Sequence, residues 1–475
     1  MKLIRLKLVC CVLSLCLFFQ NSHLRADWST PVQLSGIDSE AYGYDPVIGM
    51  DQNGNTVANW FQSINNGDFY YIYSETLPYK GNWSLPTIMQ SPATQSPPQF
   101  SLIADTPSLA MSTNASGFTV AVWNASDNQY SNENDFVVAA TLSPGGQWTV
   151  PVAISTPGAD VDNPYYISSL QVAVDPSGNA VVVWIAQLNE NLPTILSATY
   201  RSGAWQTPTT AVPAEYTYLQ TQLGVDASGN ALLVYAAYTS SEFTVGYNTL
   251  PSGGAWGGPG VLQDITGSIV TGFSAPSLAM NGSGNAVVAW GQSDSNVYTA
   301  SYSSGSWSGI NIINSPDIVG DLDLVMNASG LAVVAWVDEI EDDSSQILAA
   351  TQPFGTAWSA PTIISQALVD GIEMFDPTAA INSYGNIVVM WGYIDSEEDF
   401  LLQYNTKRLG LPWGSAQMAA DLGTELPVGG PFEGPAEPGN GPLNLQLVLD
   451  TSNYAVAVWG IMLQVTGPEM GILKK

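Results

Sequence analysis

The sequence predicts an all-β protein, an eight-bladed β-propeller of four-stranded blades that is closed when the N-terminal strand completes the last blade. Three observations lead to this class. A repeat runs the length of the chain, each repeat contains short stretches typical of strands, and the two ends of the chain complement each other. Repetition at a fixed period of this size is typical of propellers and solenoids.

The first repeated signal is an apolar stretch, a turn, and a second apolar stretch that ends in an aromatic residue. Clear copies are Val172–Trp184 and Leu278–Trp290. The eight terminal aromatics are Trp60, Trp123, Trp184, Tyr235, Trp290, Trp336, Trp391 and Trp459, with a mean period of 57 residues. Both stretches are rich in Val, Ile, Ala and aromatics and are bounded by Gly, Asn, Ser and Asp, which indicates strands rather than helices.

The turn between the two stretches is a hairpin signal. It reads Asp-x-Ser-Gly-Asn at 175–179 and 226–230. In such a turn the Asp side chain accepts hydrogen bonds from the turn backbone, and Gly takes a positive φ. The two stretches are therefore expected to be paired strands, A and B.

A second signal, typically Gly-x-Trp-x-x-Pro before a short apolar stretch, falls between the copies of the first. Its tryptophans are Trp28, Trp83, Trp148, Trp205, Trp256, Trp307, Trp358 and Trp413. A third stretch, such as Ile195–Tyr200, lies between the two signals. Each repeat thus predicts four strands, A to D, as in a propeller blade. The repeated tryptophans are expected to pack between neighbouring blades.

The chain ends predict how the ring closes. The segment Trp28–Leu34 is a D strand with no A, B or C before it. The last repeat supplies A (Leu443–Leu449), B (Tyr454–Gly460) and C (Met470–Lys475) but no D. We expect the first segment to complete the last blade, which removes exposed inner edges. An open β-solenoid is the alternative, and it would not need this complementation.

Residues 1–26 have the pattern of a secretory leader, so the propeller domain is expected to span 27–475. A basic start precedes an apolar run, Leu8–Phe19, that is too short to span a bilayer. All three cysteines and the only histidine lie in this leader: Cys10, Cys11, Cys16 and His23. The mature chain then has no disulfides, thiol catalysis, Cys/His zinc sites or Ser-His-Asp triad, and we expect it to be secreted, periplasmic or at the cell surface.

The chain is strongly acidic, with a formal net charge of −31. Such a charge is expected to repel nucleic acids and anionic lipid surfaces. The high apolar content, 45%, shows that the charge is not a sign of disorder, because that many apolar residues can build a large core. Once the leader is cleaved, no segment predicts a transmembrane protein.

In an up-and-down blade, the A–B and C–D turns lie at one face of the disc and the B–C and D–A connections at the other. The longer B–C and D–A connections carry acids and aromatics, and variable loops on a rigid scaffold are where binding usually resides. The candidate binding residues are Asp338, Glu339, Glu341, Asp342, Asp343, Asp395, Glu397, Glu398, Asp399, Tyr42, Tyr44, Tyr130, Tyr165 and Tyr166. The cations Lys80, Arg201, Lys407 and Arg408 fall in C–D turns, so we expect them at the opposite face. The alternative is that the acids only solvate long loops.

Calcium at the acidic loops is the one cofactor that the pattern supports. Runs such as Asp338–Asp343 and Asp395–Asp399 offer hard oxygen ligands, but EF-hand spacing is absent. No phosphate-binding Gly-x-x-x-x-Gly-Lys-Ser/Thr run occurs. A glycosidase needs two carboxylates at a set separation, and the 41 acids single out no pair.

The repeat resembles that of secreted bacterial β-propeller proteins, whose units read Asp-x-x-Gly-Asn-Ala, a β-run, Trp, then Gly-x-Trp-Ser-x-Pro. These are grouped loosely with sialidase-like propellers, and the resemblance covers residues 28–475. The sialidase Asp box, Ser-x-Asp-x-Gly-x-x-Trp, is not matched. The three-arginine clamp implied by that family cannot form, because the mature chain has only Arg201 and Arg408. The resemblance therefore implies the fold and not sialidase activity.

The leading functional hypothesis is a non-catalytic binding or surface-interaction module. Its acidic, aromatic loop face would engage a carbohydrate, a cation or a basic protein. One alternative is a carboxylate-based glycan hydrolase or lyase that uses the same face. The other is a passive structural protein of the cell envelope.

Overall fold

The structure is a computed structural model. It describes residues 13–15, 28–29, 32, 34, 42–64, 69–90, 108–126, 135–155, 165–188, 191–238, 242–266, 274–292, 294–340, 344–366, 373–394, 400–423 and 444–459. These residues form strands and turns and contain no helix. Within them, accordingly, no helix is long and apolar enough to cross a membrane.

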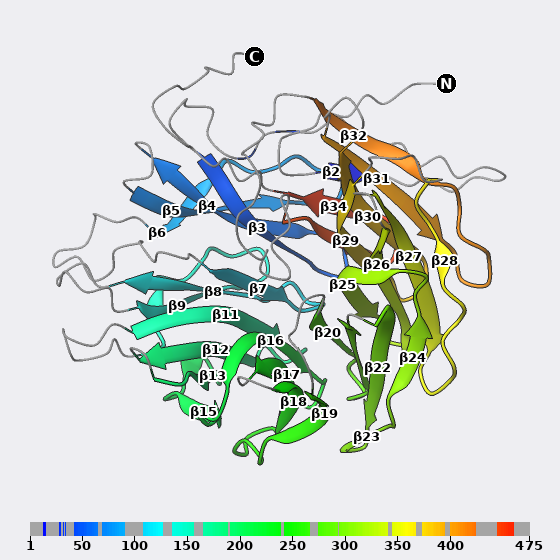
Figure 1. The fold of residues 1–475 in the computed structure, drawn as a ribbon. Coiled ribbons are helices and arrows are strands. Elements are labelled where there is room, and N and C mark those ends of the chain that lie inside the picture. The colour runs from blue at the N-terminus through cyan, green and yellow to red at the C-terminus, as the bar shows by residue number, and fades with distance from the viewer. Residues whose placement is uncertain are drawn as a thin grey trace, which may run out of the picture.

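The strands form antiparallel sheets arranged around a common axis as a β-propeller (Figure 1). Blade 1 contains β3 (Tyr42–Met50), β4 (Thr56–Ile64), β5 (Phe69–Leu77) and β6 (Thr87–Gln90). Blade 2 contains β7 (Leu109–Thr113), β8 (Thr119–Ser126), β9 (Asp135–Leu142) and β10 (Val152–Ala153). Blade 3 contains β11 (Tyr165–Val174), β12 (Ala180–Leu188), β13 (Thr194–Arg201) and a split outer strand, β14 (Ala204–Trp205) and β15 (Thr209–Val212).

The remaining blades follow the same order of strands A, B, C and D. Blade 4 contains β16 (Thr217–Val225), β17 (Ala231–Tyr238), β18 (Glu242–Leu250) and β19 (Gly260–Thr266). Blade 5 contains β20 (Ser274–Met280), β21 (Ala286–Gln292), β22 (Asn296–Ser303), β23 (Ser306–Trp307) and β24 (Asn311–Asn314). Blade 6 contains β25 (Ile318–Met326), β26 (Leu331–Ile340), β27 (Ser344–Pro353) and β28 (Thr362–Ile363). Blade 7 contains β29 (Glu373–Ile381), β30 (Ile387–Ile394), β31 (Phe400–Lys407) and β32 (Gln417–Gly423).

The expected number of blades is wrong: the structure has seven blades, not eight. The last repeat contributes only β33 (Gln446–Leu449) and β34 (Ala455–Val458), and a third strand, β2 (Leu13–Leu15), pairs with β34. We call this three-stranded sheet the closing sheet. The N-terminal strand that joins it is β2, which lies in the expected leader, rather than the segment 28–34. The C strand expected at 470–475 lies outside the described residues.

The closing sheet lies between blades 7 and 1 and completes the ring. Trp28 packs with Leu445, Leu447 and Trp459 of the last repeat, and its ring lies edge-on to that of Tyr404 in blade 7, with centroids 5.4 Å apart. On the other side, Leu34 joins a buried cluster that includes side chains of β34 and of blade 1. The segment expected to complete the last blade therefore packs beside it, without being one of the strands of its sheet.

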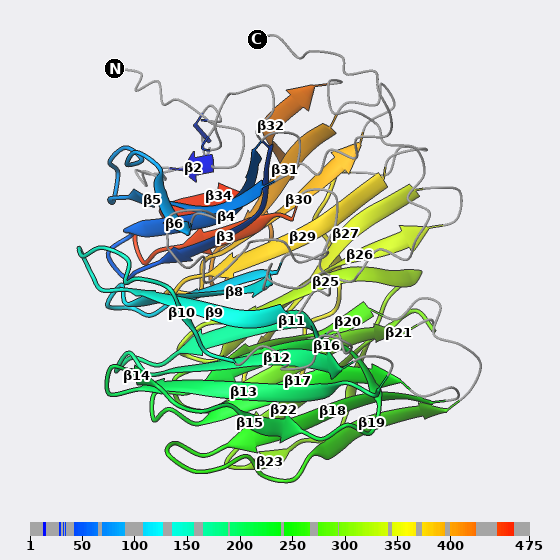
Figure 2. The same ribbon diagram turned by 90° about the vertical axis from the view of Figure 1, so that its left-hand side faces the viewer.

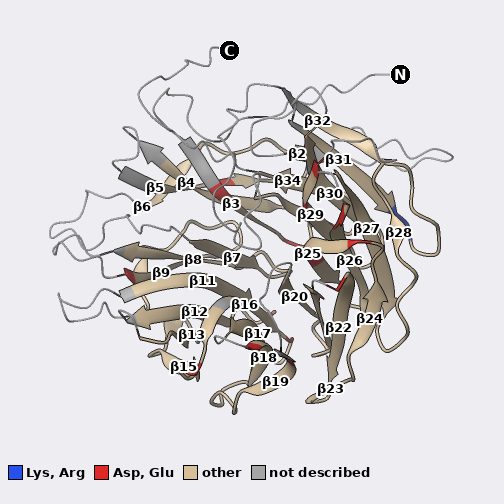
Figure 3. Cartoon of the chain, viewed as in Figure 1, with Lys and Arg blue, Asp and Glu red and all other residues tan. Residues whose placement is uncertain are grey.

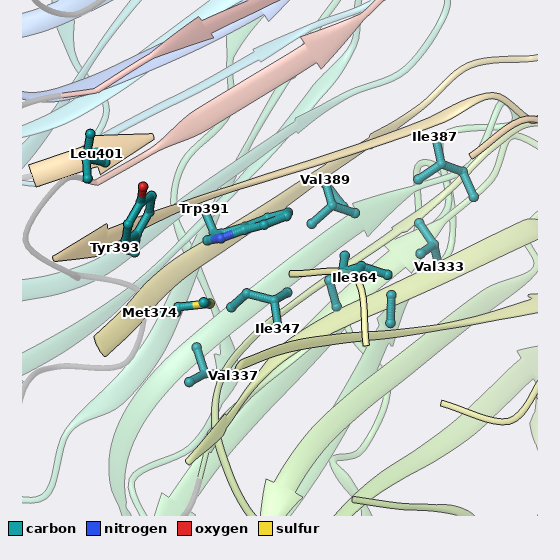
Figure 4. Packing of buried hydrophobic residues seen from close by; sticks show 13 residues of the cluster. Val333, Val337, Ile347, Ile364, Met374, Ile387, Val389, Trp391, Tyr393 and Leu401 are labelled. Carbon is teal, nitrogen blue, oxygen red and sulfur yellow. The ribbon is translucent and has the colours of Figure 1, made fainter. Parts of the chain in front are cut away.

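The core consists of layers of apolar side chains between neighbouring blades. Central strands are buried on both faces, as in Val333–Trp336 of β26, where each side chain has no exposed surface. Trp391 packs among side chains of blades 6 and 7, including Ile347 and Met374 (Figure 4). The expectation that the repeated tryptophans pack between blades is thus confirmed for the B strands. Truncation of such a side chain to Ala is expected to cost about 3–5 kcal/mol.

Candidate functional site

The A–B and C–D turns share one end of the blades, which we call the turn face. The backbone N–H of Tyr79, in a C–D turn, donates to Asn55 Oδ1 of the adjacent A–B turn at 3.1 Å. Blade 4 repeats this contact, from the N–H of Ser252 to Asn230 Oδ1 at 2.9 Å. Figure 2 shows the blades from the side, with strands running between the two ends. The opposite end, where the B–C and D–A connections leave the strands, is the loop face.

The A–B turns are built around one Asp or Asn side chain each: Asp51, Asn114, Asp175, Asp226, Asn281, Asn327, Asn382 and Asp450. In the turn at Asp175, one carboxylate oxygen accepts from the N–H groups of Ser177 and Asn179, both at 2.8 Å. The other oxygen accepts from Asn179 Nδ2 at 2.8 Å. Gly178 has a φ of 81°, so the sequence-based interpretation of this turn is confirmed. All four turn aspartates are buried. Their carboxylate oxygens accept hydrogen bonds within the turns and are not free to bind a ligand.

Charge is separated between the two faces. Exposed carboxylates of the described side chains lie at the loop face: Glu215, Asp264, Asp294, Glu339 and Glu373. The described cations, Lys80, Arg201, Lys407 and Arg408, lie in C–D turns at the turn face. Figure 3 shows acidic residues along the strands of several blades. The expected polarity of the disc is therefore found in the part of the chain that the structure describes.

A further set of residues, all but one of them polar, lies on or next to the inner strands, where the A strands of six blades contain a β-bulge. The set occupies one position per repeat, six residues before the Asp or Asn of the turn, and we call it the bulge position. Its residues are Asp45, Ser108, Ser169, Gln220, Ala275, Asp321, Asp376 and Asn444. Four of them have a positive φ between 41° and 51°: Asp45, Ser169, Asp376 and Asn444.

The carboxylates at the bulge position gather in one sector of the ring. Asp321 and Asp376 belong to blades 6 and 7, Asn444 precedes β33, and Asp45 belongs to blade 1. Asn444 Nδ2, next to the closing sheet, donates to Asp45 Oδ1 of blade 1 at 3.0 Å. This set was not predicted from the sequence. Its signal was the Asp-Pro pair at 45–46 and 376–377, in register with the turn residue of each repeat.

Burial raises the pKa of several carboxylates in this sector. Desolvation raises the pKa of Asp45 and of Asp321 above the usual range. Burial also raises the pKa of Glu339, and the negative charge of nearby Asp321 raises it further. Glu339 reaches this place because Gly320 has no side chain: a Cβ there would lie 2.7 Å from Glu339 Oε1.

Asp323 lies two residues after Asp321 in β25, and it is a second carboxylate of this strand that is removed from water. Its Oδ2 accepts from the backbone N–H of Ala379 in blade 7 at 2.8 Å, and it also accepts from the N–H of Leu324. Burial nevertheless raises its pKa to about 6. The two backbone donors offset only part of the cost of removing this carboxylate from water.

The sequence-based site residues are found in three kinds of place. Asp338 lies in β26 rather than in a loop, and it is fully buried. Its oxygens accept from Ser315 Oγ, from the N–H of Asp317 at 3.0 Å and from Gln346 Nε2 at 2.8 Å, so it fixes the D–A connection.

Two others are exposed at the loop face, Glu339 at the end of β26 and Tyr166 in β11. Backbone alone is described for Tyr42, Tyr44 and Tyr165, which lie in β3 and β11. The rest lie outside the described residues: Tyr130, Glu341, Asp342, Asp343, Asp395, Glu397, Glu398 and Asp399. The structure therefore does not bring the sequence-based set together as one site.

Metal binding gains no support from the described side chains. Among them, no group of three or more Asp, Glu, His or Cys residues could hold a metal ion. The acidic runs that suggested calcium are mostly outside the described residues, and Asp338 is occupied by three protein donors. Calcium thus stays an expectation from the sequence.

No protein-family model and no curated protein matches the chain. Among solved structures, it is similar to a protein of unknown function from Dyadobacter fermentans, with 10% identity and a TM-score of 0.40 over 66% of this chain and 95% of that one. A Hadza microbial sialidase has 10% identity and a TM-score of 0.37, over 80% and 87% of the two chains. A lectin from Aleuria aurantia has 16% identity and a TM-score of 0.34, over 69% and 98%.

Proposed function

We propose that this chain is a non-catalytic binding module whose loop face holds a positively charged partner, such as a basic protein segment. The observation that carries the proposal is the separation of exposed charge between the two faces. Carboxylates are exposed at the loop face, while the described lysines and arginines lie at the turn face. A face of one sign attracts a ligand of the opposite sign and orients its approach.

The carboxylates in the sector of blade 6 add a specific reason for a cation to bind. Burial raises the pKa values of Asp321 and Glu339, and the negative charge of Asp321 raises the pKa of Glu339 further. A cationic group that approaches both would stabilise their ionised forms and lower both pKa values. Binding is therefore expected to release protons and to strengthen as pH rises through the range in which these groups titrate.

A glycan is the second candidate ligand, and two exposed tyrosines favour it. Tyr166 of β11 and Tyr238 of β17 are 46% and 39% exposed at the loop face. Aromatic side chains combine an apolar ring with a polar tip, which suits contact with the apolar face of a sugar ring. The exposed carboxylates of the same face would accept hydrogen bonds from sugar hydroxyl groups.

The test is calorimetric titration of the protein with a hexalysine peptide at low and high salt. Glu339→Gln should weaken binding about fivefold, because it removes one exposed partner charge. Asp51→Asn is the matched control, since it also converts a carboxylate to an amide but lies buried in a turn. It should leave the affinity unchanged, because Asn occupies the same turn position at Asn114.

Four outcomes would overturn the proposal or part of it. Equal losses for Glu339→Gln and Asp51→Asn would show that the loop face is not the site. Binding to a glycan array but not to hexalysine would favour the sugar ligand, and hydrolysis of an oligosaccharide would contradict the non-catalytic part. Absence of all three activities would favour the passive structural alternative.

A further inference from the structure

In blades 4 and 7, an asparagine of the C strand bonds to the outer strand region of the preceding blade. Asn248 Nδ2 of β18 donates to the carbonyl of Ala211 in β15 of blade 3 at 2.7 Å. Asn405 Nδ2 of β31 donates to the carbonyl of Ile364, next to β28 of blade 6, at 2.8 Å. Each amide thus holds one blade against the blade before it.

Leu34 offers the same kind of acceptor to blade 1. Ala211 and Ile364 each lie six residues after a tryptophan of the second repeated signal. Leu34 lies six residues after Trp28, the first of these tryptophans. The carbonyl of Leu34 is therefore the sequence equivalent of the two carbonyls that accept from the asparagines.

The packing of Trp28 and Leu34 supports this equivalence. Trp28 lies edge-on to Tyr404 of blade 7, with ring centroids 5.4 Å apart, and Trp307 of blade 5 lies edge-on to Tyr247 of blade 4 with centroids 5.5 Å apart. Leu34 is 7% exposed and packs with side chains of blade 1. Trp28 thus contacts the blade on one side and Leu34 the blade on the other, as the equivalent residues of an outer strand do.

Glu75 occupies the asparagine position in blade 1. It is paired with Ala58 of β4, at the register that each asparagine has in its own sheet. Directly opposed residues have their side chains on the same face of a sheet. Ala58 packs in one buried cluster with Leu34, and Glu75 is 4% exposed. The carboxyl group of Glu75 is therefore buried on the face of blade 1 that packs against Leu34.

Blade 1 differs from blades 4 and 7 in the hydrogen bonds that remain for this position. The amide oxygens of the two asparagines accept from the next backbone N–H, that of Thr249 at 2.8 Å and that of Thr406 at 2.7 Å. In blade 1 the N–H of Thr76 donates to Ser84 Oγ at 3.0 Å instead. The serine therefore fills the acceptor role, and the donor role is left for Glu75. A carboxyl group can donate only when it is protonated.

Burial favours the protonated form of Glu75. Removal from water is the cause that raises its pKa to about 7. The other titratable side chains described on the strands and turns that pack around this face are Asp45, Asp51, Tyr73, Tyr79, Lys80, Asp450 and Tyr454. None of these groups contributes to the shift, so the site itself, and not a neighbouring charge, keeps the proton on Glu75.

We propose that the protonated carboxyl group of Glu75 donates a hydrogen bond to the carbonyl of Leu34 and holds Leu34 against blade 1. Ionisation of Glu75 transfers its proton to water, breaks this bond and leaves a negative charge facing a carbonyl oxygen. The packing of Leu34 on blade 1 is then loosened beside the closing sheet. This goes beyond the proposed function, because it does not depend on what the loop face binds.

Acid conditions favour the closed contact. An exposed glutamate has a pKa of about 4.3, whereas that of Glu75 is about 7 when the contact is formed. The closed form thus binds more protons between these values. Its stabilisation by Glu75 is complete below about pH 4.5 and is lost as pH rises through about 7.

Hydrogen exchange followed by mass spectrometry tests the contact. The probe is the peptide that contains Leu34, and its protection factor is compared at about pH 5.5 and about pH 8.5, so that the change in intrinsic exchange rate is removed. The protection factor of the wild type should fall about tenfold or more between these values, because ionisation favours the open form. Peptides of blade 4 should keep their protection.

Two substitutions separate the hydrogen bond from the charge. Glu75→Gln keeps a donor that does not titrate, so the protection factor should stay within about twofold across the same pH range. Glu75→Ala introduces the residue found at this position in blades 3 and 5, at Ala198 and Ala300. It removes both the donor and the charge, and protection should be about fivefold below that of Glu75→Gln at both pH values.

Infrared spectroscopy measures the proton itself. The difference spectrum between the wild type and Glu75→Gln isolates this one carboxyl group. Its protonated band should be present at about pH 5.5 and disappear as pH rises through about 7. Glu242→Gln is the matched control, since it makes the same change at a partly exposed glutamate of β18 in blade 4. It should keep the wild-type dependence of Leu34 protection on pH.

The proposal is overturned if wild-type protection does not fall with pH, if Glu75→Gln keeps the wild-type pH dependence, or if the infrared band persists at about pH 8.5. An equal loss of protection in the peptides of blade 4 would also overturn it, because global unfolding would then explain the result. Circular dichroism and the melting temperature establish that each variant is folded. Hexalysine binding at the loop face is measured separately, so its failure would not affect this result.

Discussion

Two groups of buried carboxylates differ in what surrounds them. In the turns, Asp175 is 2% exposed, and its two oxygens accept three hydrogen bonds from its own turn. On the inner strand of blade 6, Asp323 accepts from the backbone of Leu324 and Ala379, and burial raises its pKa to about 6. The turn carboxylate is part of a local structure that supplies its donors, whereas the inner carboxylate depends on a neighbouring blade.

The turn face and the loop face also differ in how their acidic residues are used. The turn face carries four aspartates that contribute structure and little exposed charge. The loop face carries exposed carboxylates such as Glu339 and Glu373 that the fold does not use in this way. The same residue types therefore form turn structure at one face and stay exposed at the other.

The largest expected effect is at the turn carboxylate. Asp175→Ala leaves two backbone N–H groups and Asn179 Nδ2 without their acceptor, and should lower the free energy of unfolding by about 2–3 kcal/mol. Asp175→Asn is the control and should cost under about 1 kcal/mol, because an amide oxygen serves in the same place at Asn114 and Asn327. Urea unfolding measures both. Equal costs would remove the distinction between the two groups of carboxylates.

The next effect is a pH dependence at Asp323. Its pKa is raised to about 6 in the folded protein, against about 3.9 in an unfolded chain. The folded state thus binds more protons between these values, and the contribution of Asp323 to stability is lost as pH rises from about 4 to 6. Asp323→Asn keeps an acceptor for the Ala379 N–H and removes the titration.

The measurement is the difference in unfolding free energy between the wild type and Asp323→Asn at pH 4.5 and pH 7.5. It should change by roughly 2 kcal/mol, in favour of the variant at the higher pH. A difference that does not vary with pH would show that Asp323 is already ionised at the lower pH. Its two backbone donors would then stabilise the carboxylate as fully as the turn donors stabilise that of Asp175.

A second effect of the same sign is expected at Glu75 in β5. Burial raises its pKa to about 7, so its contribution to stability falls as pH rises from about 4.5 to 7. Amides occupy the equivalent position in blades 4 and 7, where Asn248 Nδ2 donates to the carbonyl of Ala211 at 2.7 Å and Asn405 Nδ2 to that of Ile364 at 2.8 Å. Glu75→Gln should therefore be more stable relative to the wild type at pH 8 than at pH 4.5, by roughly 2–3 kcal/mol. A destabilised variant at pH 8 would contradict this.

The smallest effect is at a turn-face cation. Arg201 donates to Ser252 Oγ at 3.2 Å across two neighbouring turns, and this hydrogen bond is exposed. Arg201→Ala should change the free energy of unfolding by less than about 0.5 kcal/mol. A larger loss in the same urea assay would mean that the cations of the turn face hold the ring together, as its aspartates do.

Much of the fold could be predicted because its signals are local. The Asp, Gly and Asn of the 175–179 turn carry their geometry within five residues, and the repeated tryptophans mark equivalent positions in successive blades. The closing sheet could not be predicted in this way. Its third strand comes from β2, and the choice between β2 and any other segment beside β34 depends on contacts between opposite ends of the chain.

The site was less predictable for a related reason. A run of acids after Val337 was interpreted as a loop, but β26 continues through Asp338 to Ile340 because Ser315, Asp317 and Gln346 supply donors for Asp338. Those donors come from an adjacent connection and strand, which no local pattern reveals. The bulge position likewise becomes visible only when the repeats are aligned on their turns.

The ring can close only late in synthesis, after the last repeat has been made. Asn444 contacts Asp45 across 399 residues of sequence, and Ser452 contacts Tyr79 across 373. Individual blades consist of hairpins that can form as each emerges during synthesis, but the contact between blade 1 and the closing sheet must await nearly the whole chain. Until then the apolar side of blade 1 that packs on β34 stays uncovered, so the growing chain would be most prone to aggregation just before β34 is released.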